Sequence, residues 1–102
     1  MSDIMLPFRP QFQRPMMDGT KLMTCRTEKK GDPGDVFEAW GHRFVLTHVM
    51  RMQLGYVGSD CFEQEGVKSV QEFMEVWKSI HPTKGFDGDQ IVWAHCFRRV
   101  DL

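Results

Sequence analysis

A long run of alternating side chains between Phe44 and Leu54 constrains the fold more than any other feature. If this run is extended, one face carries Phe44, Leu46, His48, Met50, Met52 and Leu54. The opposite face carries Val45, Thr47, Val49, Arg51 and Gln53. Period-two alternation indicates a strand, and both faces are only half apolar, which is typical of a curved sheet or barrel with one face inside. We therefore predict a long strand in such a sheet.

Other segments read as shorter elements around this strand. Strands are expected at residues 21–26, 36–40 and 90–99, and Gly41-His42 fits a two-residue hairpin turn of type II′ because glycine comes first. A short helix is expected at 11–18, limited by Pro15, and a short acidic helix at 60–66.

The clearest helix signal lies between Ser69 and Pro82. Ser69 and Glu72 match a capping box, and apolar residues recur at helical spacing from Val70 to Ile80. We predict a helix over 70–80 that ends before the proline.

The chain has 102 residues, which predicts one domain, 1–102, with one core. This length is too short for a dinucleotide-binding α/β domain. Together the elements predict an α+β fold, a small and nearly closed β-barrel of about five or six strands with two or three short helices.

Charge, cysteine content and the lengths of the apolar runs argue against a strongly basic nucleic-acid-binding protein, a disulfide-rich protein and a membrane protein. The net charge of -1 gives no overall positive field for nucleic acid, so such binding needs a local patch. Three cysteines without a Cys-x-x-Cys spacing favour a reducing compartment. We find no signal peptide or apolar run long enough for a membrane span, and expect a cytoplasmic protein.

Metal and cofactor sites are not expected. His95 and Cys96 are neighbours on a predicted strand and would face opposite ways, and no pair of histidines or cysteines has the spacing of a zinc site. His48 and His95 share a face with apolar residues, so we expect both at the edge of the core, bonded to backbone carbonyls. No local sequence ties a histidine to a cysteine nucleophile.

Basic residues gather in one segment and acidic residues in another. Residues 21–30 carry Lys21, Arg26, Lys29 and Lys30, whereas residues 60–75 are mainly acidic. A basic strand beside exposed aromatic rings is typical of surfaces that hold phosphates while bases stack. Tyr56, between Gly55 and Gly58, is the candidate stacking ring. The ordinary alternative is that these are solvated faces of a small domain.

Several short motifs in order resemble the ASCH domain family. They are Gly19-x-Lys21-x-x-Thr24-x-Arg26 after a short helix, the pairs Gly34-Asp35 and Glu65-Gly66, a Ser-capped helix with a Trp, and a closing apolar strand. The resemblance covers nearly the whole chain, although Pro15 and the bulky Leu22 and Met23 depart from the pattern. It implies a PUA-like β-barrel with a cleft between barrel and helices that holds RNA or a modified nucleoside.

The resemblance also implies a possible activity. Some small bacterial members are amidohydrolases that remove the acetyl group of N4-acetylcytidine with a Lys, a Thr and a Glu. By motif, these fall on Lys21, Thr24 and Glu65, with Glu63 as the alternative carboxylate. Arg26 would anchor the substrate or the backbone.

Elementary chemistry sets conditions on these roles. Thr24 is a poor nucleophile unless a base takes its proton, and Lys21 is a base only when it is neutral; a charged Lys21 would instead bind an anion. Three residues apart on a straight strand, Lys21 and Thr24 face opposite ways, so Lys21 must lie in the turn before the strand. Glu65 would then act as the acid or hold the amine of a cytosine-like group.

Three hypotheses follow. The first is a module that binds RNA or a nucleoside through Lys21, Thr24, Arg26 and Glu65, with Lys29, Lys30 and Tyr56 as further contacts. The second is the amidohydrolase, and the third is a regulatory protein whose acidic helix docks a partner. The ordinary alternative for the site is a strand-forming Thr24, a solvated Lys21 and a helix-end Glu65.

Overall fold

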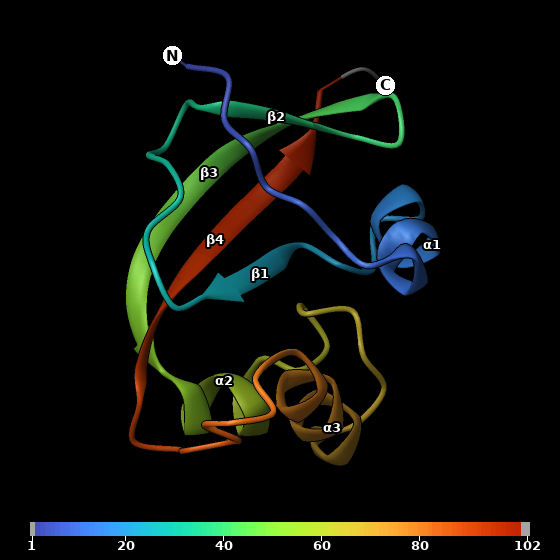
Figure 1. Cartoon of the computed structure of the whole chain (residues 1–102). Coiled ribbons are helices and arrows are strands. Elements are labelled where there is room, and N and C mark those ends of the chain that lie inside the picture. The colour runs from blue at the N-terminus through green and yellow to red at the C-terminus, as the bar shows by residue number, and fades with distance from the viewer. Residues whose placement is uncertain (1, 101–102) are drawn as a thin grey trace.

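The computed structural model describes residues 2–100 and shows a curled, four-stranded antiparallel sheet with short helices at its ends (Figure 1). The strands are β1 Met23–Arg26, β2 Val36–Ala39, β3 His42–Gln53 and β4 Ile91–Arg99. Their order across the sheet is β1-β4-β3-β2, so β1 and β2 are the edge strands.

The described residues thus form four strands rather than the five or six predicted, and the sheet is a half-barrel. From residue 2 onward, the N-terminal segment extends along β2 but pairs with it only at the isolated bridge between Asp3 and Val36. The loop at residues 27–35 contains no strand. The segments that could close the barrel therefore lack continuous pairing.

The long strand is confirmed as β3, but its faces do not alternate throughout. The pairing of β3 with β4 shifts between Leu46 and His48, as in a β-bulge. Phe44 and Leu46 are buried before the shift, and His48 is exposed after it. The prediction that His48 lies at the edge of the core is wrong for this reason.

His95 is fully buried on β4, and its ring is bonded to the backbone as predicted. Its Nδ1 lies 3.3 Å from the carbonyl oxygen of Thr24, and its Nε2 accepts from the amide of Lys30 at 3.0 Å. These two partners fit a neutral ring with its proton on Nδ1.

The turn between β2 and β3 is type I′ rather than type II′. Ala39 pairs with His42, which leaves Trp40 and Gly41 as the two turn residues. Both have positive φ, 50° and 78°, the combination that type I′ requires. The strand ends one residue earlier than its apolar run indicates, and Trp40 takes a left-handed conformation.

The helices are η1 Pro10–Phe12, α1 Gln13–Met17, α2 Leu54–Asp60 and α3 Val70–Ile80. The prediction of a helix at 60–66 is wrong, because α2 comes earlier and residues 61–66 form turns. Gly55 allows α2 a close contact: a Cβ there would lie 3.0 Å from the carbonyl oxygen of Gly88, which accepts from the Gly55 amide at 2.9 Å.

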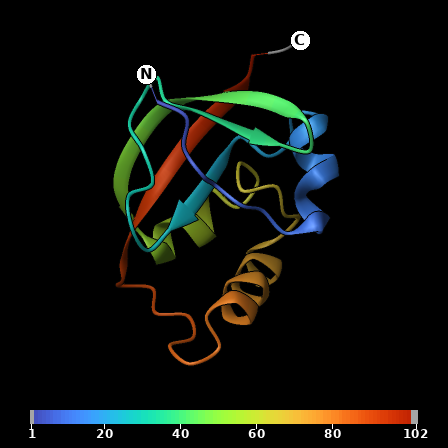
Figure 2. The same ribbon diagram turned by 45° about the horizontal axis from the view of Figure 1, so that its top comes forward.

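The helix α3 has its predicted boundaries. The Ser69 hydroxyl accepts from the Glu72 amide at 3.1 Å. The Glu72 carboxylate lies 3.4 Å from the amide of Lys68, one residue before the cap. Together α2 and α3 cover one end of the sheet, while α1 lies at the other end beyond β1 (Figures 1 and 2).

Aromatic rings fill the core between β2, β3 and β4. Phe37 stacks on Phe44 with centroids 5.2 Å apart, and Phe97 meets both edge-on at 5.4 and 5.6 Å. Such contacts add to the apolar area that the rings bury. This cluster anchors the three strands, and β1 joins the sheet beside it.

Candidate ligand-binding pocket

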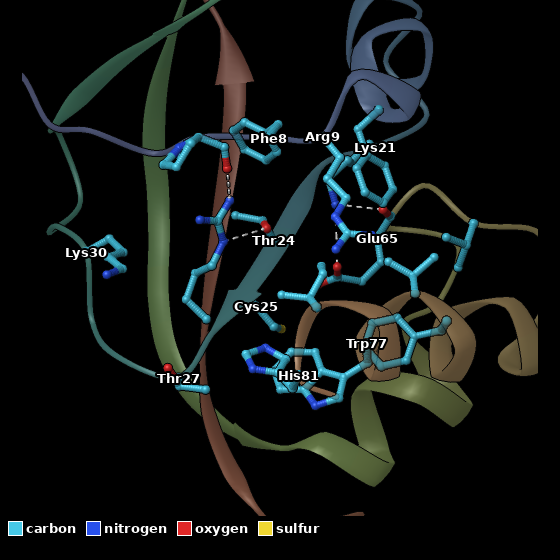
Figure 3. A pocket seen from close by; sticks show the side chains of 17 residues that line it. Phe8, Arg9, Lys21, Thr24, Cys25, Thr27, Lys30, Glu65, Trp77 and His81 are labelled. Carbon is cyan, nitrogen blue, oxygen red and sulfur yellow. Dashed lines mark hydrogen bonds and ion pairs between the residues drawn. The ribbon is translucent and has the colours of Figure 1, made fainter. Parts of the chain in front are cut away.

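A cavity of about 480 Å³ lies beside β1, between the N-terminal segment and α3 (Figure 3). Five of the predicted site residues line it: Lys21, Thr24, Arg26, Lys30 and Glu65. The structure therefore brings together a cation, a hydroxyl and a carboxylate from distant parts of the sequence.

Lys21 and Glu65 form a buried pair at one side of this pocket. The Lys21 ammonium donates to the carbonyl oxygens of Met23 at 2.8 Å and Glu65 at 2.7 Å, and lies 3.4 Å from Glu65 Oε1. The Lys21 side chain is only 2% exposed, and the Phe12 ring lies 4.5 Å from its nitrogen. Three acceptors match the three N–H groups of a charged ammonium.

Two effects act on the protonation of Lys21. Burial lowers the pKa of Lys21 because it disfavours the charged form, and the Glu65 carboxylate raises the pKa in return. Burial is the larger effect, so the pKa lies below its ordinary value of 10.5. This lysine is not the solvated charge of the ordinary alternative.

Gly66 explains how the chain brings Glu65 against Lys21. Its φ is +87°, and a Cβ at this position would lie 2.7 Å from the Cβ of Lys21. Only glycine fits both the conformation and the contact. The turn at Glu65-Gly66 therefore packs directly on the lysine stem.

Lys21 lies before the strand, which is the condition for it to share a pocket with Thr24. Its amide donates to the carbonyl oxygen of Pro15 at 2.9 Å, and β1 begins only at Met23. The strict alternation that would separate Lys21 from Thr24 therefore does not apply.

Thr24 and Arg26 form the next part of the wall. Arg26 Nε donates to the Thr24 hydroxyl oxygen at 3.3 Å, and Arg26 Nη2 donates to the carbonyl oxygen of Pro7 at 2.6 Å. The guanidinium also lies 5.1 Å from the centre of the Phe8 ring. The Thr24 hydroxyl keeps its own proton for a further partner.

The opposite wall comes from α3 and is mostly apolar. Trp77 and His81 lie one helical turn apart with ring centroids 4.4 Å from each other, and both line the pocket. Arg9 Nη1 donates to the Ser79 hydroxyl at 2.7 Å and so ties the N-terminal segment to this helix. Burial lowers the pKa of His81.

Two buried side-chain atoms around the pocket have no hydrogen-bond partner within residues 2–100. They are Glu65 Oε2 and Trp77 Nε1, and both residues line the cavity. Buried polar atoms are nearly always hydrogen-bonded, so each such exception needs an explanation.

Three candidate residues lie elsewhere. Lys29 pairs with Asp32 at 2.8 Å, Tyr56 projects from α2 with 52% of its surface exposed, and Glu63 is not part of the pocket lining. Contact of Lys29 and Tyr56 with nucleic acid stays a prediction.

Sequence reasoning missed several residues of the pocket, among them Phe8, Phe12, Cys25 and His81. Trp77 lies in the apolar repeat of the predicted helix and is buried, and it also forms a pocket wall. His81 follows Trp77 by four residues, immediately after the end of α3, and this spacing is a signal that could have suggested a shared wall.

In the part of the chain that the structure describes, no group of three or more His, Cys, Asp or Glu residues could hold a metal ion. The helices formed by these residues are also too short or too polar to cross a membrane.

Comparison with known proteins shows the fold. No family model and no curated protein sequence matches the chain. Among solved structures, an ASCH domain from Lactobacillus crispatus matches with a TM-score of 0.74 at 15% identity, over 96% of this chain and 78% of that one. A Pyrococcus furiosus protein matches with a TM-score of 0.67 at 15% identity, over 99% and 96% of the two chains. An Enterococcus faecalis protein matches with a TM-score of 0.65 at 19% identity, over 90% and 68%.

The chain therefore has an ASCH-like fold, as the sequence resemblance implies.

Proposed function

We propose that the chain binds a nucleoside, or a single base of an RNA, in the pocket beside β1. The observation that carries this proposal is the Oε2 atom of Glu65, a buried acceptor that no N–H or O–H group of residues 2–100 reaches, in a cavity that a ligand can enter. An unmatched buried acceptor costs about 1–3 kcal/mol or more, which a ligand N–H would recover.

The remaining walls suit a nucleoside. An amine such as that of cytosine supplies the N–H donors that a carboxylate accepts. The aromatic rings of Phe8 and Trp77 offer surfaces for a flat base, and base stacking on such rings is worth about 1–3 kcal/mol. Arg9, Arg26 and Lys30 also line the pocket and supply positive charge for a phosphate.

Calorimetric titration with cytidine tests the proposal. We expect Glu65→Gln to weaken binding at least about tenfold, because the amide no longer offers a charged acceptor. Glu63→Gln is the matched control, since Glu63 is two residues away and outside the lining. Absence of cytidine binding, or equal losses in the two variants, would contradict the proposal.

A second candidate is hydrolysis of N4-acetylcytidine, for which the buried Thr24 hydroxyl in the same pocket is the favouring observation. The Lys21 proton would pass to Glu65 Oε1, 3.4 Å away, leaving a neutral amine that accepts the Thr24 proton. Thr24 Oγ1 would attack the acetyl carbonyl, and the protonated Glu65 would donate to the leaving cytosine nitrogen. Water would then hydrolyse the acetyl ester on Thr24.

Release of cytidine from N4-acetylcytidine tests this candidate. Thr24→Val should abolish release and leave cytidine binding within about threefold, because the hydroxyl is needed for bond formation. Thr20→Val is the control, since its hydroxyl bonds Asp18 outside the pocket. Full turnover in Thr24→Val would exclude Thr24 as the nucleophile.

A further inference from the structure

The pocket runs along the free edge of β1 rather than over one of its faces. Thr24, Cys25 and Arg26 of β1 all line it, although successive side chains on a strand point to opposite faces. Three consecutive strand residues border one pocket when the pocket lies along the side of the strand. Since β1 is the last strand of the sheet, this side is open to a ligand.

Hydrogen bonding to β4 fixes which main-chain groups face this edge. The Phe97 amide donates to the carbonyl oxygen of Leu22 at 3.0 Å, and the register pairs Met23 with Cys96 and Cys25 with Ala94. In an antiparallel pair, hydrogen-bonded and non-hydrogen-bonded residues alternate. The N–H and C=O groups of Met23 and Cys25 therefore point away from β4.

Met23 confirms this direction. Its amide donates to the carbonyl oxygen of Gln64 at 3.0 Å, and its own carbonyl oxygen accepts from Lys21 Nζ at 2.8 Å. Both groups of Met23 are thus used by partners beyond the free edge.

Cys25 has no such partners. Within residues 2–100, no hydrogen bond outside the sheet uses its N–H or C=O. Figure 3 shows Cys25 on β1 between Thr24 and the α3 side chains, at the pocket wall. One donor and one acceptor of the main chain therefore stand side by side at the pocket, next to the Lys21–Glu65 pair.

We infer that the main chain of Cys25 recognises the ligand by hydrogen bonds. Its N–H donates to a ring nitrogen of the base, and its C=O accepts from an adjacent amine. This inference rests on the proposed function and narrows the ligand to bases with an amine beside a ring-nitrogen acceptor, such as cytosine or adenine. Glu65 accepts the second proton of the amine. The base then forms the same paired bonds that a neighbouring strand would form.

The edge is too short for an extended peptide. Strand addition uses successive outward pairs along an edge, but the groups of Met23 are occupied and β1 ends at Arg26. A single free pair suits a small flat ligand.

The test compares cytidine with 3-deazacytidine, which keeps the amine but has a C–H group in place of the ring nitrogen N3. We expect 3-deazacytidine to bind the full chain about tenfold more weakly, because the Cys25 N–H would face no acceptor. In ¹⁵N-resolved NMR, cytidine should shift the Cys25 amide proton downfield and slow its exchange, with the Glu38 amide on β2, the opposite edge strand, as the unaffected reference.

A variant provides the second arm. Cys25→Pro removes the N–H without breaking a sheet hydrogen bond, because that group faces outward on an edge strand. Cytidine binding should fall about tenfold in a variant whose NMR spectrum shows the native sheet. The ligand comparison on the unaltered chain decides the matter if this variant does not fold.

The outcomes separate this inference from the proposed function. One outcome is that cytidine binding depends on Glu65, 3-deazacytidine binds equally well and the Cys25 amide does not shift. This result overturns recognition by the Cys25 main chain and leaves the proposed function standing. Absence of binding by either nucleoside overturns both.

Discussion

The aromatic cluster and the Lys21–Glu65 pair are both buried, but the first buries apolar rings and the second buries charged groups. Phe37, Phe44 and Phe97 bury only apolar surface, and each ring contacts the other two. Lys21 and Glu65 form a buried ion pair, and no N–H or O–H group in the described part of the chain reaches Glu65 Oε2. Stability alone explains the cluster, whereas a buried ion pair is often no more stable than apolar residues of the same size. The difference indicates that the pair is present for its chemistry.

The largest effect is expected from the aromatic cluster. Phe44→Ala should lower the free energy of unfolding by about 3–5 kcal/mol, because it leaves a cavity between two other rings. Denaturant unfolding followed by fluorescence measures this loss. The folded fraction should still bind cytidine, and loss of binding in folded molecules would show that the two regions are not independent.

Breaking the ion pair comes next. Lys21→Met should cost about 3 kcal/mol, because it leaves the Glu65 carboxylate buried without its cation. The double variant Lys21→Met, Glu65→Met should recover most of that stability and still fail to bind cytidine. The matched control is Lys29→Met, which breaks the exposed pair with Asp32 and should cost less than about 1 kcal/mol.

If the double variant is as unstable as Lys21→Met, the conclusion that the ion pair is present for its chemistry rather than for stability is wrong. The pair would then be a structural element comparable to the aromatic cluster.

A smaller effect is expected at the start of α3, the apolar wall of the pocket. Ser69→Ala removes the side-chain acceptor for the Glu72 amide and should cost about 1 kcal/mol. Thermal unfolding measures the change, and Ser59→Ala, whose hydroxyl lies near the end of α2, serves as the control. An equal effect in both would show that the cap contributes nothing particular.

The smallest effect concerns pH and the buried His95. Burial is the largest effect on the pKa of His95 and lowers it below its ordinary value of 6.5. As the pH falls through 6.5, the unfolded chain takes up this proton before the folded chain does, so the free energy of unfolding decreases until the pH is below the folded pKa. Protonation also removes the acceptor for the Lys30 amide.

Unfolding measured between pH 7 and pH 5 should therefore lose less stability in His95→Gln than in the unaltered chain. His48→Gln, at an exposed position, is the control. Some loss remains in the variant, because burial also lowers the pKa of His81. An unchanged slope in His95→Gln would contradict the role given to His95.

Local signals predicted the elements that depend on local interactions. The boundaries of α3 follow from the Ser69 cap and Pro82, and β3 follows from its alternation. The type of the β2–β3 turn, the bulge before His48 and the position of α2 could not be predicted in this way. They depend on strand register and on the contact of Gly55 with Gly88, which only the folded chain brings about.

The residues of the site also fall into those that the sequence predicts and those that only the folded chain identifies. Resemblance of motifs placed Lys21, Thr24, Arg26 and Glu65 together, and the structure brings all four to one pocket. Sequence reasoning does not identify Cys25 as a binding residue, because the open edge of β1 depends on the order of the strands in the sheet. Main-chain N–H and C=O groups are the same for nearly every residue, so the sequence does not show which of them face a pocket.

The contact between Gly66 and the stem of Lys21 has a practical consequence. Because the glycine has no side chain, the residue before it is brought to the lysine by backbone packing rather than by a long side chain reaching across. An engineer who moves this pocket to another half-barrel would need to transplant the glycine with the carboxylate. In a new sequence, an acidic residue followed by glycine is then the place to look for the partner of a buried lysine.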